Sequence, residues 1–208
     1  MGSVLIYKYE KALLEEGYLN ICGVDEVGRG PLAGPVVAAA VILKPNSHLL
    51  LTDSKKLTKK QRQTLVPQIK EQSLAISIAF VDHEIIDEIN ILNASKQAML
   101  EAINTLALTP DYVLIDALDL KEGLSMPSLS IIKGDMKSAS IAAASIIAKE
   151  ARDAYMLKMD ELFPVYGFKN HMGYPTKTHI EKIKSHGICP IHRKTFKPIK
   201  TWIENLEL

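Results

Sequence analysis

Two adjacent acids, Asp25 and Glu26, precede an arginine held between two glycines in the sequence GVDEVGRGP, residues 23–31. Carboxylates bind hard divalent cations through oxygen. Glycines let a backbone approach a phosphate closely, and an arginine between them can bind the phosphate oxygens. Metal and phosphate recognition within one turn indicates an enzyme that acts on phosphodiesters, although a Gly-Arg-Gly triplet alone is a weak signal.

Two further acids occupy positions where they could join this pair. Asp25 and Asp116 each follow a run of apolar strand residues, and Asp135 lies on a loop before the longest helical segment. A carboxylate at a buried strand is usually paired or metal-bound. Adjacent strand residues face opposite sides, so Asp25 and Glu26 serve one site only where the strand ends or bulges. Residue types alone leave Asp116 open as an exposed strand-end residue and Asp135 as a helix N-terminal residue favoured by the macrodipole.

Basic residues gather in two segments of a chain whose net charge is only +1. One is the run Lys55, Lys56, Lys59, Lys60 and Arg62, and the other spans residues 169–200, with eight Lys or Arg against the single acid Glu181. Such patches suit a groove that follows a phosphate backbone. A solvated lysine-rich face is the alternative.

Apolar periodicity predicts strands at 20–27, 36–43, 74–81, 112–116 and 129–133. In 74–81 bulky residues alternate with small ones, which predicts a strand with one better-buried face. Helices are expected at 4–17, 83–90, 94–107, 138–162 and 199–206, with two more starting at the capping boxes of Thr58 and Thr178. We expect Pro67 to interrupt the first of these two, and Asn93 to cap the helix at 94. Three strands followed by alternating strands and helices predict an α/β fold.

Length and composition set further bounds. The 208 residues are 47% hydrophobic, enough for a single domain spanning 1–208. Cys22 and Cys189 are the only cysteines, which gives no disulfide framework. The N-terminus has no signal-peptide apolar region, and the longest apolar stretches are too short to span a membrane. We expect a cytoplasmic protein with no membrane association.

Other chemistries fit less well. His186, Cys189 and His192 could bind zinc, but no fourth ligand is evident. The phosphate-binding patterns G-x-x-x-x-G-K-[ST] and G-x-G-x-x-G do not occur, and neither does the G-x-S-x-G of serine hydrolases.

Besides GVDEVGRGPLAGPVVAAAV at 23–41, the chain contains DSKKL (53–57), LID (114–116), KGD (133–135), AASIIAK (143–149), Arg152-Asp153, HMGYPT (171–176) and HRK (192–194). In this order they closely resemble the ribonuclease HII family, the bacterial type 2 ribonucleases H, from about residue 20 to about residue 200. The resemblance implies a ribonuclease H-like fold, with a mixed five-stranded sheet flanked by helices and a small helical region at about 165–208 for substrate binding.

The resemblance implies that Asp25, Glu26, Asp116 and Asp135 are both the catalytic and the metal-binding residues, with Mg²⁺ or Mn²⁺ as cofactor and two ions when substrate is bound. Two metals can stabilise the attacking and leaving oxygens of phosphodiester hydrolysis. The implied activity is hydrolysis of the RNA strand of RNA–DNA hybrids and cleavage 5′ of single ribonucleotides in duplex DNA, leaving 3′-hydroxyl and 5′-phosphate ends. The alternative is a non-catalytic nucleic-acid-binding protein on the same fold, against which the four intact acids argue.

The resemblance also implies the substrate contacts, and a monomer is the simplest expectation for the oligomeric state. Recognition of the ribose 2′-hydroxyl, which separates RNA from DNA, falls to Gly28, Arg29, Gly30 and Tyr174. The expected phosphate contacts are Ser54, Lys55, Lys56, His192, Arg193 and Lys194. Two positions depart from the family pattern: Ala117 stands where many members have glycine, and Met172 stands where lysine is common.

Overall fold

The computed structural model describes residues 6–51 and 57–205. Its centre is one five-stranded sheet in the order β3-β2-β1-β4-β5. The first three strands pair antiparallel, while β4 and β5 run parallel to β1. The strands are β1 (Ile21–Val27), β2 (Val36–Leu43), β3 (Ser73–Val81), β4 (Tyr112–Asp116) and β5 (Ser128–Ile131). The mixed five-stranded α/β sheet predicted from the sequence is therefore confirmed.

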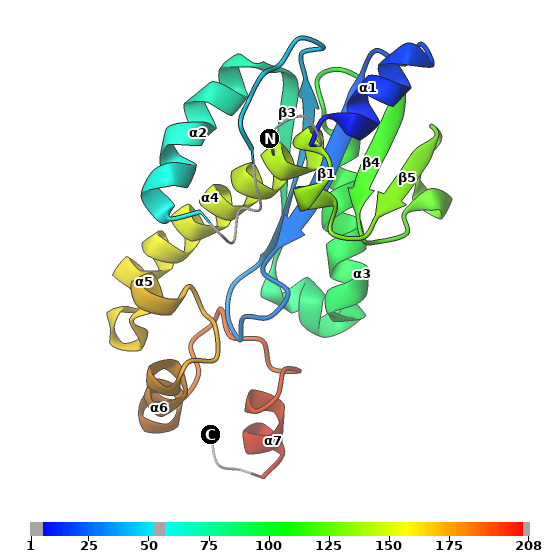
Figure 1. The fold of residues 1–208 in the computed structure, drawn as a ribbon. Coiled ribbons are helices and arrows are strands. Elements are labelled where there is room, and N and C mark those ends of the chain that lie inside the picture. The colour runs from blue at the N-terminus through cyan, green and yellow to red at the C-terminus, as the bar shows by residue number, and fades with distance from the viewer. Residues whose placement is uncertain (1–5, 52–56, 206–208) are drawn as a thin grey trace.

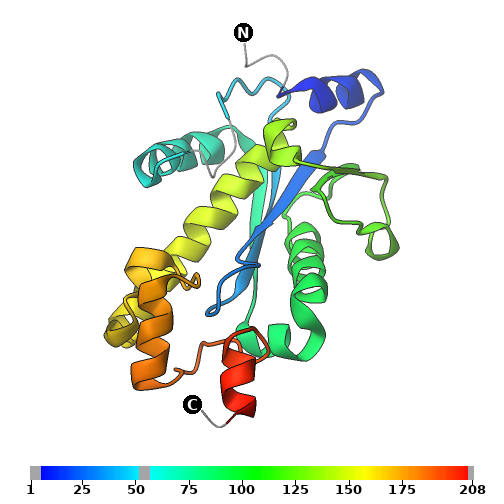
Figure 2. The ribbon, with the colours of Figure 1, turned by 60° about the horizontal axis from the view of Figure 1, so that its bottom comes forward.

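Helices cover both faces of the sheet (Figure 2). One face packs against α3 (His83–Asn104), and the other packs against α2 (Lys59–Glu71) and α4 (Ala139–Leu162). Every residue of β2 is buried, as expected for a strand with both faces covered. Its sequence VVAAAVIL supplies small side chains that let the Ala-rich first half of α4 approach closely.

The remaining helices lie at opposite ends of the sheet (Figure 1). At one end is α1 (Lys8–Glu15), and at the other are α5 (Phe168–His171), α6 (Lys177–His186) and α7 (Ile199–Glu204). Short 3₁₀ turns, η2 (Lys121–Gly123), η3 (Gly134–Met136) and η4 (Pro164–Tyr166), complete the order. No helix in 6–51 or 57–205 is long and apolar enough to cross a membrane.

One face of β3 is better buried, as predicted, and it is the face that carries the small side chains. Ala75, Ala79 and Val81 are its buried side chains, while Ile78 and Phe80 are 41% and 45% exposed. The small residues face α3, which packs against them closely. The bulky residues lie on the other face of this edge strand, which α2 and α4 cover only in part.

Three helix boundaries differ from the predictions. The α2 helix continues through Pro67, because Ile69 beyond it is fully buried in the core and holds the segment in place. A kink at Asn90 separates the two halves of α3, and the Asn90 Oδ1 accepts hydrogen bonds from the amides of Leu92 and Asn93, so Asn90 is the cap. The cap of α6 is Thr176 and not Thr178.

Candidate active site

The parallel pairing of β1 and β4 brings the first acids together. Val24 lies opposite Ile115 in this register, so Asp25 and Asp116 follow at the same end of neighbouring strands. Asp116 is the last residue of β4. The carboxyl ends of parallel strands are a common place for functional side chains. The open reading of Asp116 as a solitary exposed residue does not hold, because it lies close enough to raise the pKa of Asp25.

Asp25 and Glu26 are the acids of this site whose pKa values are raised by burial and neighbouring charge. Burial, followed by the charges of Glu26 and Asp116, raises the pKa of Asp25 well above its usual value. Hydrogen bonds from Ser145 and from the Glu26 amide, 2.7 Å from Asp25 Oδ1, act against this rise. Burial also raises the pKa of Glu26, Arg29 lowers it, and Asp116 raises it further. The carboxylates of Asp25, Glu26 and Asp116 therefore lie close together where water has little access.

Asp135 is linked to these three carboxylates through the main chain. It belongs to η3, where the amide of the preceding Gly134 donates to Asp116 Oδ1 at 2.7 Å. Asp135 is buried, with 6% of its surface exposed. It lies in η3, three residues before Ser138, which caps α4, so it is not in the first turn of the long helix as the alternative would have it.

The donor set fits a hard divalent cation. Glu26 binds Arg29 Nη1 through Oε1 at 3.3 Å, and its Oε2 is buried without a hydrogen-bond partner among the described residues. A buried oxygen of this kind is normally satisfied. Within 6–51 and 57–205, however, no three His, Cys, Asp or Glu side chains are grouped as ligands of one ion. The acids therefore form an incomplete set of oxygen ligands, which suits Mg²⁺ or Mn²⁺ because these ions retain water and substrate oxygens.

Two buried arginines hold the glycine loop that follows Glu26. Arg193 donates from Nε and Nη2 to the Gly34 carbonyl at 3.0 and 2.8 Å, and from Nη2 to the Gly28 carbonyl at 2.6 Å. Arg152 donates to the carbonyls of Pro35 and Ala33. Burial lowers the pKa of Arg193 to about 9, so it is still charged at neutral pH. Gly28 has φ +101° and a Cβ there would lie 2.4 Å from Arg152 Nε, so this position requires glycine.

The same network brings Tyr174 to the glycine loop. The Leu32 amide donates to the Gly173 carbonyl at 2.8 Å, and Arg152 Nη1 donates to the Met172 carbonyl at 3.0 Å. A Cβ at Gly30 would lie 3.5 Å from Tyr174 Cε1. Tyr174 is 40% exposed, so its ring lines an open surface beside the loop. The expected meeting of the loop with Tyr174 is seen at Gly30.

Two expected phosphate contacts are wrong. His192 and Arg193 are both fully buried, and the Arg193 guanidinium donates to carbonyls of the glycine loop, so neither side chain can reach a phosphate directly. Lys194 is exposed and remains available. Ser54, Lys55 and Lys56 lie outside the described residues.

One member of the predicted basic patches serves another purpose. Arg62 is buried and pairs with Glu150 at 2.7 Å and with Asp153 at 3.1 Å, joining α2 to α4. Asp153 also pairs with Lys149, so it is a structural acid.

A chain of neutral histidines supports the Tyr174 turn. The Cys189 amide donates to His192 Nδ1 at 2.8 Å, His192 Nε2 lies 3.1 Å from His179 Nε2, and His179 Nδ1 lies 2.9 Å from the Tyr174 carbonyl. One assignment satisfies all three bonds: His192 Nε2–H donates to His179, whose Nδ1–H donates to Tyr174. Burial lowers the pKa of both rings to about 4. With both ring nitrogens of His192 engaged in hydrogen bonds, the interpretation of His192 as a zinc ligand is wrong.

Sequence reasoning missed Ser145, Arg152 and His179. Ser145 and Arg152 stand in motifs whose pattern identifies the family and does not reveal that one contacts Asp25 and the other the glycine loop. A lone histidine at 179 gives no signal, because its partners come from elsewhere in the chain.

Comparison with known proteins identifies the family. The family described as Ribonuclease HII matches residues 22–199. The ribonuclease HII of Enterococcus faecalis is 56% identical over 197 residues, which cover 94% of this chain and 76% of that protein. This chain belongs to the ribonuclease HII family. It is a ribonuclease H, and therefore a nuclease.

Solved structures agree with this fold. Ribonuclease H2 from Pyrococcus horikoshii matches with a TM-score of 0.78 at 27% identity, over 90% of this chain and 98% of that one. Bst-RNase HIII in complex with Mn²⁺ matches with a TM-score of 0.68 at 18% identity, over 93% of this chain and 72% of that one, which is a likeness of fold alone.

The backbone conformation at residue 117 favours glycine, although this chain has alanine there. Ala117 has φ +54°, the left-handed region that glycine adopts without strain. The methyl group is therefore tolerated at a turn where glycine is the less strained residue.

Proposed function

We propose that this ribonuclease is a metal-dependent endonuclease that hydrolyses the RNA strand of RNA–DNA hybrids and cuts on the 5′ side of a single ribonucleotide in duplex DNA. The products are a 3′-hydroxyl and a 5′-phosphate that bears the ribonucleotide. The observation that carries the proposal is the acid cluster, in which burial and the charge of Asp116 raise the pKa values of Asp25 and Glu26, and Glu26 Oε2 has no described partner. A cluster this poorly neutralised is suited to bind cations.

Asp25, Glu26, Asp116 and Asp135 would hold the divalent ions. Bound ions of this kind supply charge stabilisation for the attacking and leaving oxygens and lower the pKa of bound water. The chain itself contributes fixed positions: Ser145 and the Glu26 amide orient Asp25, and the Gly134 amide orients Asp116. Arg29 is 43% exposed at its side chain, so it can turn from Glu26 to a phosphate oxygen.

The glycine loop and Tyr174 would read the 2′-hydroxyl. Arg152 and Arg193 fix the loop backbone, so Gly28, Arg29 and Gly30 can present main-chain groups without first paying an ordering entropy. Tyr174 would stack on the neighbouring sugar from its exposed position beside Gly30. Lys194, Ser54, Lys55 and Lys56 are assigned to the phosphate backbone, within one domain whose residues at about 165–208 extend the substrate surface. We assign the active form as a monomer in the cytoplasm.

One experiment tests this function. Wild type is incubated with three labelled duplexes, an RNA–DNA hybrid, DNA with one ribonucleotide, and DNA alone, each with Mg²⁺, Mn²⁺ or EDTA. Cleavage of the first two with metal, and of none with EDTA, is expected. End analysis should place the cut 5′ of the lone ribonucleotide.

Asp116→Asn provides the matched variant. It preserves the size of the side chain and an acceptor for the Gly134 amide, but removes the charge. Cleavage should fall by at least about 10³-fold, while folding and duplex binding are retained. If Asp116→Asn cuts at the wild-type rate, the acid assignment is wrong. Binding of both duplexes without cleavage by wild type would support the non-catalytic alternative.

A further inference from the structure

A buried acid outside the cluster contacts the helix that follows Asp135. Glu10 of α1 is 7% exposed, and its Oε1 accepts hydrogen bonds from Ser138 Oγ at 2.6 Å and from the Ser140 amide at 2.9 Å. Both donors belong to the first turn of α4, whose cap is Ser138. An acceptor of this kind satisfies amides that a helix start leaves without partners.

The contact continues from Ser138 to the acids. The Ser138 hydroxyl proton goes to Glu10, so its lone pairs are left for the Ile141 amide at 3.2 Å. The Ser138 amide donates to the Gly134 carbonyl at 2.8 Å, and the Gly134 amide donates to Asp116 Oδ1 at 2.7 Å. A continuous series of hydrogen bonds therefore runs from α1 to Asp116, and it encloses Asp135 between Gly134 and Ser138.

Packing fixes the same elements to one another. Leu13 of α1 contacts a cluster made of Ile21 of β1, Leu114 of β4, Ile131 of β5 and Ile141 of α4. Gly23 of β1 lies so close to α4 that a Cβ would be 2.1 Å from the Ser140 carbonyl carbon. Strands β1 and β4, which carry Asp25 and Asp116, therefore pack against the start of α4 next to α1.

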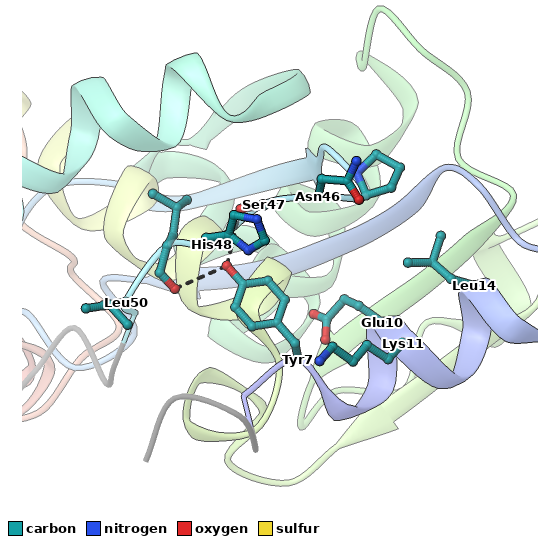
Figure 3. A pocket seen from close by; sticks show the side chains of 10 residues that line it. Tyr7, Glu10, Lys11, Leu14, Asn46, Ser47, His48 and Leu50 are labelled. Atoms are coloured by element: carbon teal, nitrogen blue, oxygen red, sulfur yellow. Dashed lines mark hydrogen bonds between the residues drawn. The ribbon is translucent and has the colours of Figure 1, made fainter. Parts of the chain in front are cut away.

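The N-terminal end of α1 is anchored separately. The Tyr7 hydroxyl donates to the Leu49 carbonyl at 3.1 Å and lies 3.2 Å from Ser47 Oγ. Figure 3 shows Tyr7, at the start of α1, and Glu10 and Lys11 of α1 facing the segment that carries Asn46, Ser47, His48 and Leu50. Residues of both segments line a cavity of about 390 Å³ beside the Tyr7 contact. With Tyr7 holding one end of α1 and Leu13 the other, Glu10 has little freedom to move.

We propose that Glu10 is a positioning residue for the metal-binding acids, acting through Ser138 and Gly134 on Asp116 and Asp135. The inference rests on the proposed function of those acids. Glu10 touches neither metal nor substrate, so its effect is the placement of η3 relative to β4. Partners of this outer kind typically change metal affinity or activity by about 10- to 100-fold when they are removed.

A comparison of Glu10→Ala with Glu10→Gln separates an effect on the positions of the metal-binding acids from a general loss of folding. Burial raises the pKa of Glu10, against the hydrogen bonds from Ser138 and Ser140. An amide of the same length is the closest substitute in shape. Gln retains the oxygen that accepts both bonds, and its amide nitrogen takes the position of Oε2, which is buried without a described partner. Glu15→Ala, an exposed acid on the same helix, is the matched control.

The expected result is a split between kcat and KM. Glu10→Ala should lower kcat on the hybrid by about 10- to 100-fold and leave KM within about twofold, because no substrate contact is lost. Glu10→Gln should stay within about threefold of wild type, and Glu15→Ala should match wild type.

Metal binding gives a second readout that needs no cleavage. Mn²⁺ should raise the melting temperature of wild type by binding the folded state. In Glu10→Ala the Mn²⁺ concentration for the same increment should rise by about tenfold, and in Glu10→Gln it should not. Ser138→Ala, which breaks the same connection, should behave like Glu10→Ala and decides the question if Glu10→Ala does not fold.

Two outcomes would overturn the inference: unchanged kcat and Mn²⁺ dependence in Glu10→Ala, or an equal loss in Glu10→Ala and Glu10→Gln. Failure of the proposed function looks different, because wild type would then cut neither duplex whatever the effect of Glu10 on Mn²⁺ binding.

Discussion

At the scale of single residues, Glu26 divides its two oxygens between different partners. Oε1 pairs with the half-exposed Arg29, while Oε2 lies buried with no described partner. Arg29 therefore neutralises the cluster from its solvent side and leaves an oxygen for a cation. A bound phosphate would attract Arg29 away from Glu26, and a cation would take the place of Arg29 beside Glu26. Binding of metal should therefore raise the affinity for substrate, and binding of substrate should raise the affinity for metal.

Tyr174 is the residue whose replacement should separate the two substrates. Its backbone is held by His171 and His179 whatever the side chain, so Tyr174→Ala removes only the ring beside Gly30. A lone ribonucleotide permits one productive register, whereas a hybrid offers many. We expect kcat on the lone-ribonucleotide duplex to fall by about 100-fold and on the hybrid by about tenfold or less, because misplaced phosphate reacts slowly.

Single-turnover rates on both duplexes measure this difference. Tyr174→Phe keeps the ring and loses only the hydroxyl, so it should retain most of the selectivity and serves as the control. Equal losses on the two duplexes for Tyr174→Ala would exclude Tyr174 from junction recognition.

At the scale of elements, short-range pattern accounts for the strands and their acids. The apolar runs before Asp25 and Asp116 predict β1 and β4 to within one residue, because burial along a strand is a local property. The role of Arg193 could not be predicted, since His-Arg-Lys reads as a basic surface motif. Arg193 is buried against carbonyl groups of the glycine loop, which is distant from it in the sequence. No local pattern encodes this contact. The sequence also did not indicate which face of β3 is covered, because helix placement decides this for an edge strand.

The turn after β4 contains a strained position that substitution should relieve. Ala117 has φ +54°, and its amide donates to the Ile131 carbonyl at 3.1 Å, which locks the turn. A left-handed conformation costs a non-glycine residue roughly 1–2 kcal/mol, and glycine gives back about half through chain entropy. Ala117→Gly should therefore raise the free energy of unfolding by about 0.5–1 kcal/mol.

Urea denaturation with an unchanged slope measures this gain. The control is Ala12→Gly, the same substitution at an exposed position inside α1, which should lower the free energy of unfolding by about 0.5–1 kcal/mol. A loss of stability in Ala117→Gly would show that the turn is not strained by its methyl group.

At the scale of the whole molecule, the two ends of the sheet support the site differently. At one end α1 contacts the acids through the start of α4, and at the other the C-terminal segment holds the glycine loop and the Tyr174 turn (Figure 1). The second end depends on the neutral histidine pair. A proton added to His179 would place its Nε2–H and the His192 Nε2–H 3.1 Å apart, and a proton added to His192 would point its Nδ1–H at the Cys189 amide 2.8 Å away, in both cases in a buried place.

Stability should therefore depend on pH through this pair. The pKa of both rings is lowered to about 4 in the folded protein, against about 6.5 in an unfolded chain. Between these values the unfolded state binds protons that the folded state does not, so stability is full above about pH 6.5 and falls as the pH drops toward about 4. Each ring should contribute a loss of about 3 kcal/mol across this window.

A comparison of wild type with His179→Gln isolates the effect, because Asp25 and Glu26, whose pKa values are raised by burial, act in the opposite direction in the same range. Gln can accept from His192 and donate to the Tyr174 carbonyl, but it does not titrate. The free energy of unfolding should fall more steeply with decreasing pH in wild type than in His179→Gln. Ring resonances of His179 and His192 in wild type should stay those of neutral imidazole down to about pH 4. Parallel pH profiles for the two proteins would mean that the pair is already protonated in the folded state and that another contact holds the Tyr174 turn.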